Sequence, residues 1–198
     1  MRIRMLTLFI LVALLSTAAA LRATTLARLS LDQLTAAADA VARVRCVSVE
    51  SRWENGGIWT VTTFGVVETI KGALPVQITV RLPGGRVGHL TASVDGTPKF
   101  IAGEEAVVFL EQYSGGLQVE PAPARAGGFT VTGWVEGTFR IGHDPRTARE
   151  TVTQDSSTFA VFDTATRTFR TEGVRRMPIE QFRERVTAAL ARAQEKTR

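Results

Sequence analysis

The sequence predicts a mainly β protein: a curled antiparallel barrel of the OB type with a short N-terminal helix, a β extension and a C-terminal helix. Three observations carry this prediction. Apolar and polar residues alternate along several segments, which is the period of strands with one buried face. Turn signals such as Asn55-Gly56 and Lys71-Gly72 separate these segments. The final segment repeats its apolar residues every three or four positions, as a helix does.

Residues 1–20 have the three parts of a secretory signal peptide. Arg2 and Arg4 are basic, residues 5–15 are apolar apart from one threonine, and Ala18 and Ala20 fit an A-x-A cleavage site. The apolar run is shorter than the ~20 residues that a membrane-spanning helix needs. We therefore expect cleavage after residue 20, no membrane span afterwards, and an exported protein that is periplasmic or extracellular.

The net charge and the cysteine content narrow the possible partners and cross-links of the protein. The chain has 24 basic residues, two of them in the first 20, so 22 remain against 19 acidic residues. Such a small excess argues against a nucleic-acid partner. The single cysteine, Cys46, cannot form an intramolecular disulfide and is expected to be a small buried hydrophobe.

Residues 21–120 are expected to form the barrel core. Ser30 and Gln33 match a capping box at the start of a helix that runs to about residue 38. A strand over residues 40–49 changes its apolar phase after Cys46, which indicates a bulge. Further strands are expected over residues 58–70, 76–82, 105–113 and 117–120, and residues 87–94 are either a strand or a loop over the barrel mouth.

Residues 121–198 are expected to form the extension and a helix packed on the core. A Pro- and Gly-rich linker over residues 121–128 precedes short strands near 129–135, 137–141, 150–153 and 158–162. Pro178 suits the first turn of a helix. Its apolar stripe consists of Ile179, Phe182, Val186, Leu190 and Ala193.

The glycine-rich segment after the 76–82 strand is the predicted ligand-binding site. It contains Gly84, Gly85, Arg86, Gly88 and His89, and glycine lets the backbone approach a ligand closely. No Gly-Lys-Ser/Thr follows, so it is not a nucleotide P-loop, and it lacks the dinucleotide fingerprint. The alternative is a purely structural turn between strands.

Catalytic, metal and cofactor sites are not expected. His89 lies close in sequence to Ser93 and Asp95, but no G-x-S-x-G elbow is present. His143 and Asp144 precede Pro145 in a turn, and H-E-x-x-H is absent, so no zinc site is predicted.

Three tryptophans offer a further possibility. Trp53 and Trp59 flank the Asn55-Gly56 turn and are expected to pack against each other across it. Together with Trp134 they could instead form a flat surface for sugars or bases.

A pattern of strands and turns runs through the first half of the chain. It consists of residues 38–44, 47–49, 66–72 and 76–82, followed by Ala102-Gly103-Glu104. In this pattern residues 38–111 resemble the netrin-like module of tissue inhibitors of metalloproteinases, which implies a five-stranded OB-type barrel. Members of that family coordinate the zinc of the protease through an N-terminal cysteine. Cys46 is internal here and the expected mature chain begins at Leu21, so no inhibitory residue is carried over. The ADxVxRxRxVSV opening also resembles uncharacterised exported bacterial proteins.

The leading hypothesis is an exported, non-catalytic binding or interaction module for an unknown protein or small molecule, with contacts at a barrel mouth. One alternative is a hydrolase that uses His89 with an unidentified nucleophile. Another is a binder of oligosaccharides or single-stranded nucleic acid through the tryptophans.

Overall fold

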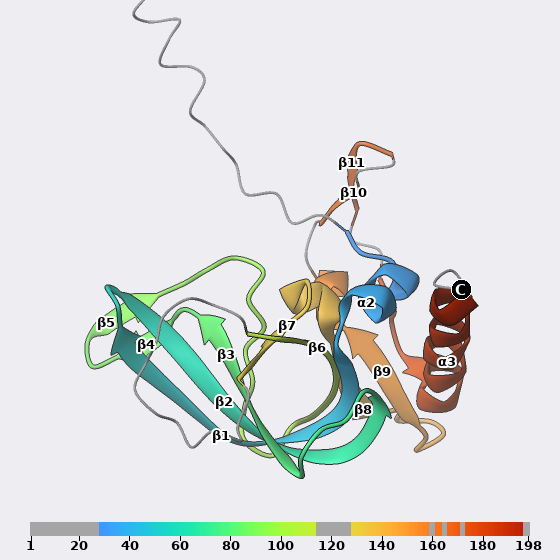
Figure 1. Ribbon diagram of the computed structural model, residues 1–198, viewed down its shortest axis with the longest axis horizontal. Helices are drawn as coiled ribbons and strands as arrows, with labels where there is room; N and C mark the ends of the chain where they lie inside the picture. Colours follow the sequence, from blue (N-terminus) through green and yellow to red (C-terminus); the bar gives the residue numbers. More distant parts are fainter. Residues whose placement is uncertain (1–27, 114–127, 159–160, 164–165, 171–172, 196–198) are drawn as a thin grey trace, which may run out of the picture.

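The computed structural model describes residues 28–113, 128–158, 161–163, 166–170 and 173–195. These residues form a curled sheet with one short helix before it and one longer helix at the C-terminal end (Figure 1). The predicted fold class is therefore confirmed. None of the helices in the described residues is long and apolar enough to cross a membrane.

The barrel is a closed circuit of five strands within the described residues. They are β1 (Ala40–Glu54), β2 (Gly57–Lys71), β3 (Gln77–Pro83), β6 (Glu105–Gln112) and β7 (Phe129–Val131). Their order is β1-β2-β3-β7-β6, and β6 pairs again with β1. The β3–β7 pairing is parallel, whereas the other pairings in the circuit are antiparallel. Strand β7 lies beyond the expected core boundary at residue 120, so the barrel takes one strand from the C-terminal part of the chain.

The short helix α2 (Leu31–Ala37) begins with the predicted capping box. The Gln33 backbone N–H donates to Ser30 Oγ at 3.2 Å, and the Ser30 N–H donates to Gln33 Oε1 at 2.8 Å. At the other end, Lys71 Nζ donates to the carbonyls of Thr35 and Ala38 at 2.7 and 2.5 Å. A cation there satisfies carbonyls that the helix leaves free, so both ends of α2 are held by side chains.

The β1–β2 hairpin confirms two predictions. Asn55 and Gly56 have φ of 49° and 79°, the left-handed conformation that a tight hairpin turn needs. The pairing register shifts between Cys46 and Ser48, where the bulge was predicted, and Val47 is left exposed. Two more register shifts nearer the start of β1 were not predicted.

The segment after β3 folds into a small hairpin of β4 (Gly85–Val87) and β5 (Leu90–Ala92). This hairpin lies at the end of the barrel far from the C-terminal helix (Figure 1). Val76 was expected on the buried face of the preceding strand, but 88% of its surface is exposed because β3 begins one residue later.

The extension continues the sheet from β6. Its elements are η2 (Trp134–Gly137), β8 (Thr138–His143), β9 (Glu150–Gln154), η3 (Asp155–Thr158), β12 (Met177–Pro178) and α3 (Ile179–Glu195), with a separate hairpin of β10 (Val161–Asp163) and β11 (Thr168–Arg170). The strand expected over residues 117–120 and most of the expected linker lie outside the described residues.

Strand β6 is buried on both faces and separates two apolar cores. Ala106, Val108 and Leu110 face the barrel interior, whereas Val107 and Phe109 face the helices. The helix-side core also contains Leu34 of α2 and the α3 residues Ile179, Phe182 and Val186. The predicted apolar stripe of α3 therefore docks on the sheet, and each large side chain buried there contributes about 1.5–3 kcal/mol.

Candidate functional site

A pocket of about 200 Å³ lies at the barrel end that carries the β4–β5 hairpin. One wall is formed by Val49 and Ser51 of β1 and by Thr60 and Thr62 of β2. The rest of the lining comes from residues 83–85, 92–94 and 97–100. The pocket is therefore enclosed between the long β1–β2 hairpin and the chain that connects β3 with β6.

Two of the hydroxyl groups in this pocket are already paired. Thr60 Oγ1 donates to the Gly84 carbonyl at 2.7 Å, and Ser51 Oγ lies 3.0 Å from Thr60 Oγ1. Since a threonine hydroxyl has one hydrogen, and that of Thr60 goes to Gly84, Ser51 is the donor of the second bond.

Two other hydroxyl groups in the pocket have no partner. The side-chain oxygens of Thr62 and Thr97 are buried and make no hydrogen bond within the described residues. Thr62 is only 1% exposed. A buried polar group without a partner costs about 1–3 kcal/mol. Both residues line the pocket, so a group that enters it can satisfy these hydroxyls once the atoms that cover them shift.

Two of the predicted binding residues, Gly84 and Gly85, line the pocket. Gly85 has a φ of +130°, and a Cβ added to it would lie 2.3 Å from Ser51 Oγ and 2.4 Å from Thr60 Oγ1. Glycine at this position thus lets the chain pass directly over the paired hydroxyls. Its role follows from close packing within the protein.

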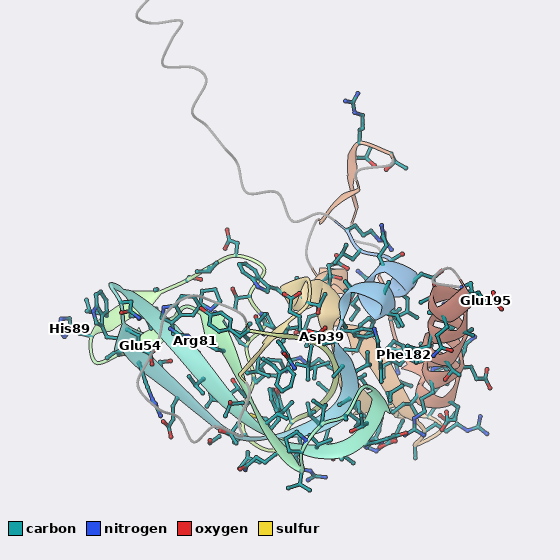
Figure 2. All side chains as sticks on the ribbon, viewed as in Figure 1. Asp39, Glu54, Arg81, His89, Phe182 and Glu195 are labelled. Carbon is teal, nitrogen blue, oxygen red and sulfur yellow. The ribbon has the colours of Figure 1, made fainter. Side chains whose placement is uncertain are left out.

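The other three predicted residues do not line the pocket. Arg86 turns back on its own hairpin, where its Nε donates to the Gly88 carbonyl at 3.1 Å. His89 is exposed at the hairpin turn, and Figure 2 shows it pointing away from the barrel. Within the described residues, no hydrogen bond joins His89 to Ser93 or Asp95, so the structure does not assemble a triad there.

The sequence contained a signal for part of this site. Ile58, Thr60, Thr62 and Phe64 alternate along β2, so the two threonines share the face of two buried apolar residues. A hydroxyl pair interrupting an apolar face indicates a polar feature inside the barrel. Thr97 carried no comparable signal, because it lies in an irregular segment.

The tryptophans do not form one surface. Trp53 is opposite Ile58 in the hairpin and Trp59 is opposite Arg52. Neighbouring residues of a strand point to opposite faces, so the expected packing of Trp53 against Trp59 is wrong. Trp134 packs against the barrel core.

Trp59 instead contacts an arginine on the outer face of the barrel. The Arg81 guanidinium lies 4.4 Å from the centre of the Trp59 ring and 5.5 Å from that of Tyr113. Its Nη2 is 2.6 Å from Glu54 Oε2, and the two side chains lie together in Figure 2. The cluster ties β2 and β3 to the residue that follows β6.

A buried carboxyl group lies in the extension. Glu136 is 2% exposed, and Gln154 Nε2 donates to its Oε2 at 2.8 Å and to its carbonyl at 2.7 Å. Burial raises the pKa of Glu136, although Ser156, Arg28 and Gln154 oppose this effect. Gln154 also lines a wider cavity of about 710 Å³ between α2, β9 and α3, but Glu136 is not part of that lining. The carboxyl group therefore anchors Gln154 and does not face the cavity.

The described residues hold no cluster of three His, Cys, Asp or Glu side chains that could bind a metal. Asp144 Oδ1 accepts hydrogen bonds from the backbone N–H groups of Arg146 and Thr147 at 2.8 and 3.1 Å. It is therefore the turn initiator that the sequence indicated. Cys46 is buried, and burial raises the pKa of its thiol, which disfavours the reactive thiolate.

No model of a known protein family matches the chain, and no curated protein matches it. The resemblance to netrin-like modules therefore depends on the pattern in residues 38–111 alone and stays a prediction.

Proposed function

We propose that this protein is an exported, non-catalytic binding module that holds a small molecule or a side chain of a partner protein at the barrel mouth. One observation carries the proposal: Thr62 is 1% exposed and lines a pocket, and its hydroxyl has no partner in the described residues. Buried polar groups in folded proteins are almost always hydrogen-bonded. An exception inside a concave pocket is typical of a binding site.

The proposal can be tested by filling the pocket from an exposed position. Val49 lines the pocket and is 38% exposed, so Val49→Phe places a ring there at little cost to the core. Val47→Phe is the matched control, because Val47 is 52% exposed and lies beside Gly65, away from the pocket.

Both variants and the wild type would be secreted with the native leader, purified, and used to capture partners from periplasmic and extracellular fractions of the source organism. Native mass spectrometry of each purified protein would detect a retained small molecule. We expect a ligand or partner that is lost with Val49→Phe and kept with Val47→Phe. Equal capture by both variants would contradict binding at this pocket.

The position of Trp59 on the outer face of β2 supports a second candidate, because OB-type barrels bind oligosaccharides and oligonucleotides across the face of their second and third strands. One face of the Trp59 ring is already covered by Arg81, which leaves less surface for stacking. Trp59→Phe and wild-type protein would be titrated with an oligosaccharide and with a single-stranded oligonucleotide. Tryptophan fluorescence that stays unchanged in both titrations would rule this candidate out.

The hydrolase hypothesis makes a different prediction for His89. His89→Ala should abolish any hydrolysis if this residue is the base, but it should leave binding at the barrel mouth unchanged, because His89 does not line the pocket.

A further inference from the structure

We propose that the barrel-mouth pocket selects an uncharged group that combines a small apolar body with hydrogen-bonding atoms, and that Thr62 and Thr97 set this selectivity. The inference rests on the proposed function, since it describes the chemistry of the same pocket. A primary amide or a hydroxyl on a ring or branched chain has the required character.

The hydrogen-bonding capacity of the pocket is the first argument. The hydrogens of Ser51 and Thr60 are both used, because Ser51 donates to Thr60 and Thr60 donates to Gly84. Thr62 and Thr97 keep a free donor and a free acceptor each. Ser93, the fifth hydroxyl-bearing residue of the lining, is exposed and can bond solvent instead. A group that both donates and accepts hydrogen bonds therefore satisfies the hydroxyls of Thr62 and Thr97 better than a group that only donates or only accepts.

The charge of the pocket is the second argument. Lys99, which is exposed, is the one charged side chain among the lining residues that the structure describes. The remaining wall is hydroxyl-bearing or apolar, and Val49, Val94 and Phe100 supply much of it. An ionised group that entered would lose its hydration without gaining a buried counter-charge, whereas a neutral amide or hydroxyl would lose far less.

The size of the pocket is the third argument. Its volume is about 200 Å³. This is smaller than the ~300–1,000 Å³ typical of sites for drug-sized ligands. The pocket therefore takes one ring or one branched side chain with a single polar substituent.

Benzamide and benzoate are suitable probes, because they share a ring and differ in the charge of the polar group at pH 7. Each would be titrated into the isotope-labelled wild-type protein, with backbone amide shifts as the readout. We expect benzamide to shift the amides of Thr62 and Thr97, and benzoate to bind at least about tenfold more weakly.

Thr62→Val and Thr97→Val remove each hydroxyl with little change of shape, and each should weaken benzamide binding about tenfold. Thr35→Val is the matched control: its hydroxyl is also buried without a partner, but it lies in α2, away from the pocket. Because none of these hydroxyls makes a hydrogen bond in the described residues, the variants lose no native hydrogen bond.

Three results would overturn the inference. Benzoate that binds as tightly as benzamide would place recognition at Lys99. If benzamide binds both valine variants as tightly as the wild type, the pocket recognises only the apolar ring and the two hydroxyls play no part. If neither probe shifts the amide signal of a pocket residue, the pocket does not bind uncharged groups of this kind. None of these results decides the proposed function, which depends on the comparison of Val49→Phe with Val47→Phe.

Discussion

Arg43 of the barrel and Glu150 of the extension form a bidentate ion pair. Arg43 Nη1 donates to Glu150 Oε2 at 2.8 Å and Nη2 donates to Oε1 at 2.7 Å. The same guanidinium also contacts Glu105 of β6. Paired guanidinium and carboxylate groups with this geometry are among the stronger polar contacts in proteins. Arg43 therefore holds β1, β6 and β9 together at the junction of barrel and extension.

Replacing Glu150 should weaken this junction. Glu150→Gln keeps the size of the side chain but removes its charge, and we expect the free energy of unfolding to fall by about 1 kcal/mol, since the carboxylate is 32% exposed and partly screened. Urea unfolding followed by tryptophan fluorescence measures the change. Glu184→Gln, on the exposed side of α3, is the control and should change stability little. Equal stabilities of the two variants would show that the pair contributes nothing.

The Arg43–Glu150 pair should also make stability depend on acidic pH. The bond to Arg43 lowers the pKa of Glu150, so the unfolded chain takes up a proton at higher pH than the folded protein. The stabilisation is complete above the unfolded pKa of about 4.3 and is lost as pH falls through the folded pKa. The stability gap between wild type and Glu150→Gln should be constant from about pH 6 to 8 and close below about pH 5. A gap that persists at low pH would contradict this.

Glu136 should act in the opposite direction. Burial raises its pKa, so the folded protein keeps a proton that the unfolded chain has lost, and wild-type stability falls as pH rises from the unfolded pKa through the folded one. Glu136→Gln has no such ionisation and still offers an oxygen to Gln154. We expect the variant to match the wild type near pH 4 and to be more stable at pH 7–8. Unfolding at several pH values tests this, and a gap that does not grow with pH would refute it.

The glycine that begins β4 and the glycine in the β4–β5 turn should respond differently to alanine. Gly85→Ala forces a methyl group against Ser51 and Thr60 at a φ of +130°, and should cost about 3 kcal/mol. Gly88→Ala also has a positive φ, of 58°, but its added Cβ meets nothing within 4 Å, so about 1 kcal/mol is expected. Thermal unfolding of both variants gives the comparison, and equal losses would argue against the close approach at Gly85.

Cys46 should be unreactive in the folded protein. Its side chain is buried, and burial raises the pKa of the thiol, so both access and thiolate content are low. A thiol reagent such as DTNB should label the native protein only as fast as it opens, and label it at once in denaturant. Val47→Cys in a Cys46→Ala background, with the exposed neighbouring position, should react rapidly without denaturant. Rapid native labelling of Cys46 would contradict its burial.

Local signals in the sequence were sufficient for much of the fold. The capping box at Ser30, the Asn55-Gly56 turn and the bulge after Cys46 each depend on a few neighbouring residues, and each is present. The stripe of α3 was equally local. Closure of the barrel was not, because β3 and β7 meet at a single residue pair, Val80 with Phe129. A contact over such a distance leaves no periodic pattern near either residue.

The binding site was only partly accessible from the sequence for a similar reason. The glycine-rich segment correctly predicted which end of the barrel carries the pocket, and Gly84 and Gly85 line it. The hydroxyls of Thr62 and Thr97 come from a strand and from an irregular segment, and only the folded chain brings them to one cavity. Glu136 was missed because a single carboxylate beside Trp134 and Val135 gives no sign that packing will bury it.

The late position of β7 in the chain has a consequence for folding. Strands β3 and β6 share β7 as a partner, and β7 follows β6 only after residues 113–128. Until β7 docks, β3 and β6 each expose an unpaired strand edge, which is a template for association with another chain. Pairing between distant segments is also slow to form. A chain that has paired its earlier strands but has not yet docked β7 is therefore open to association with a second copy.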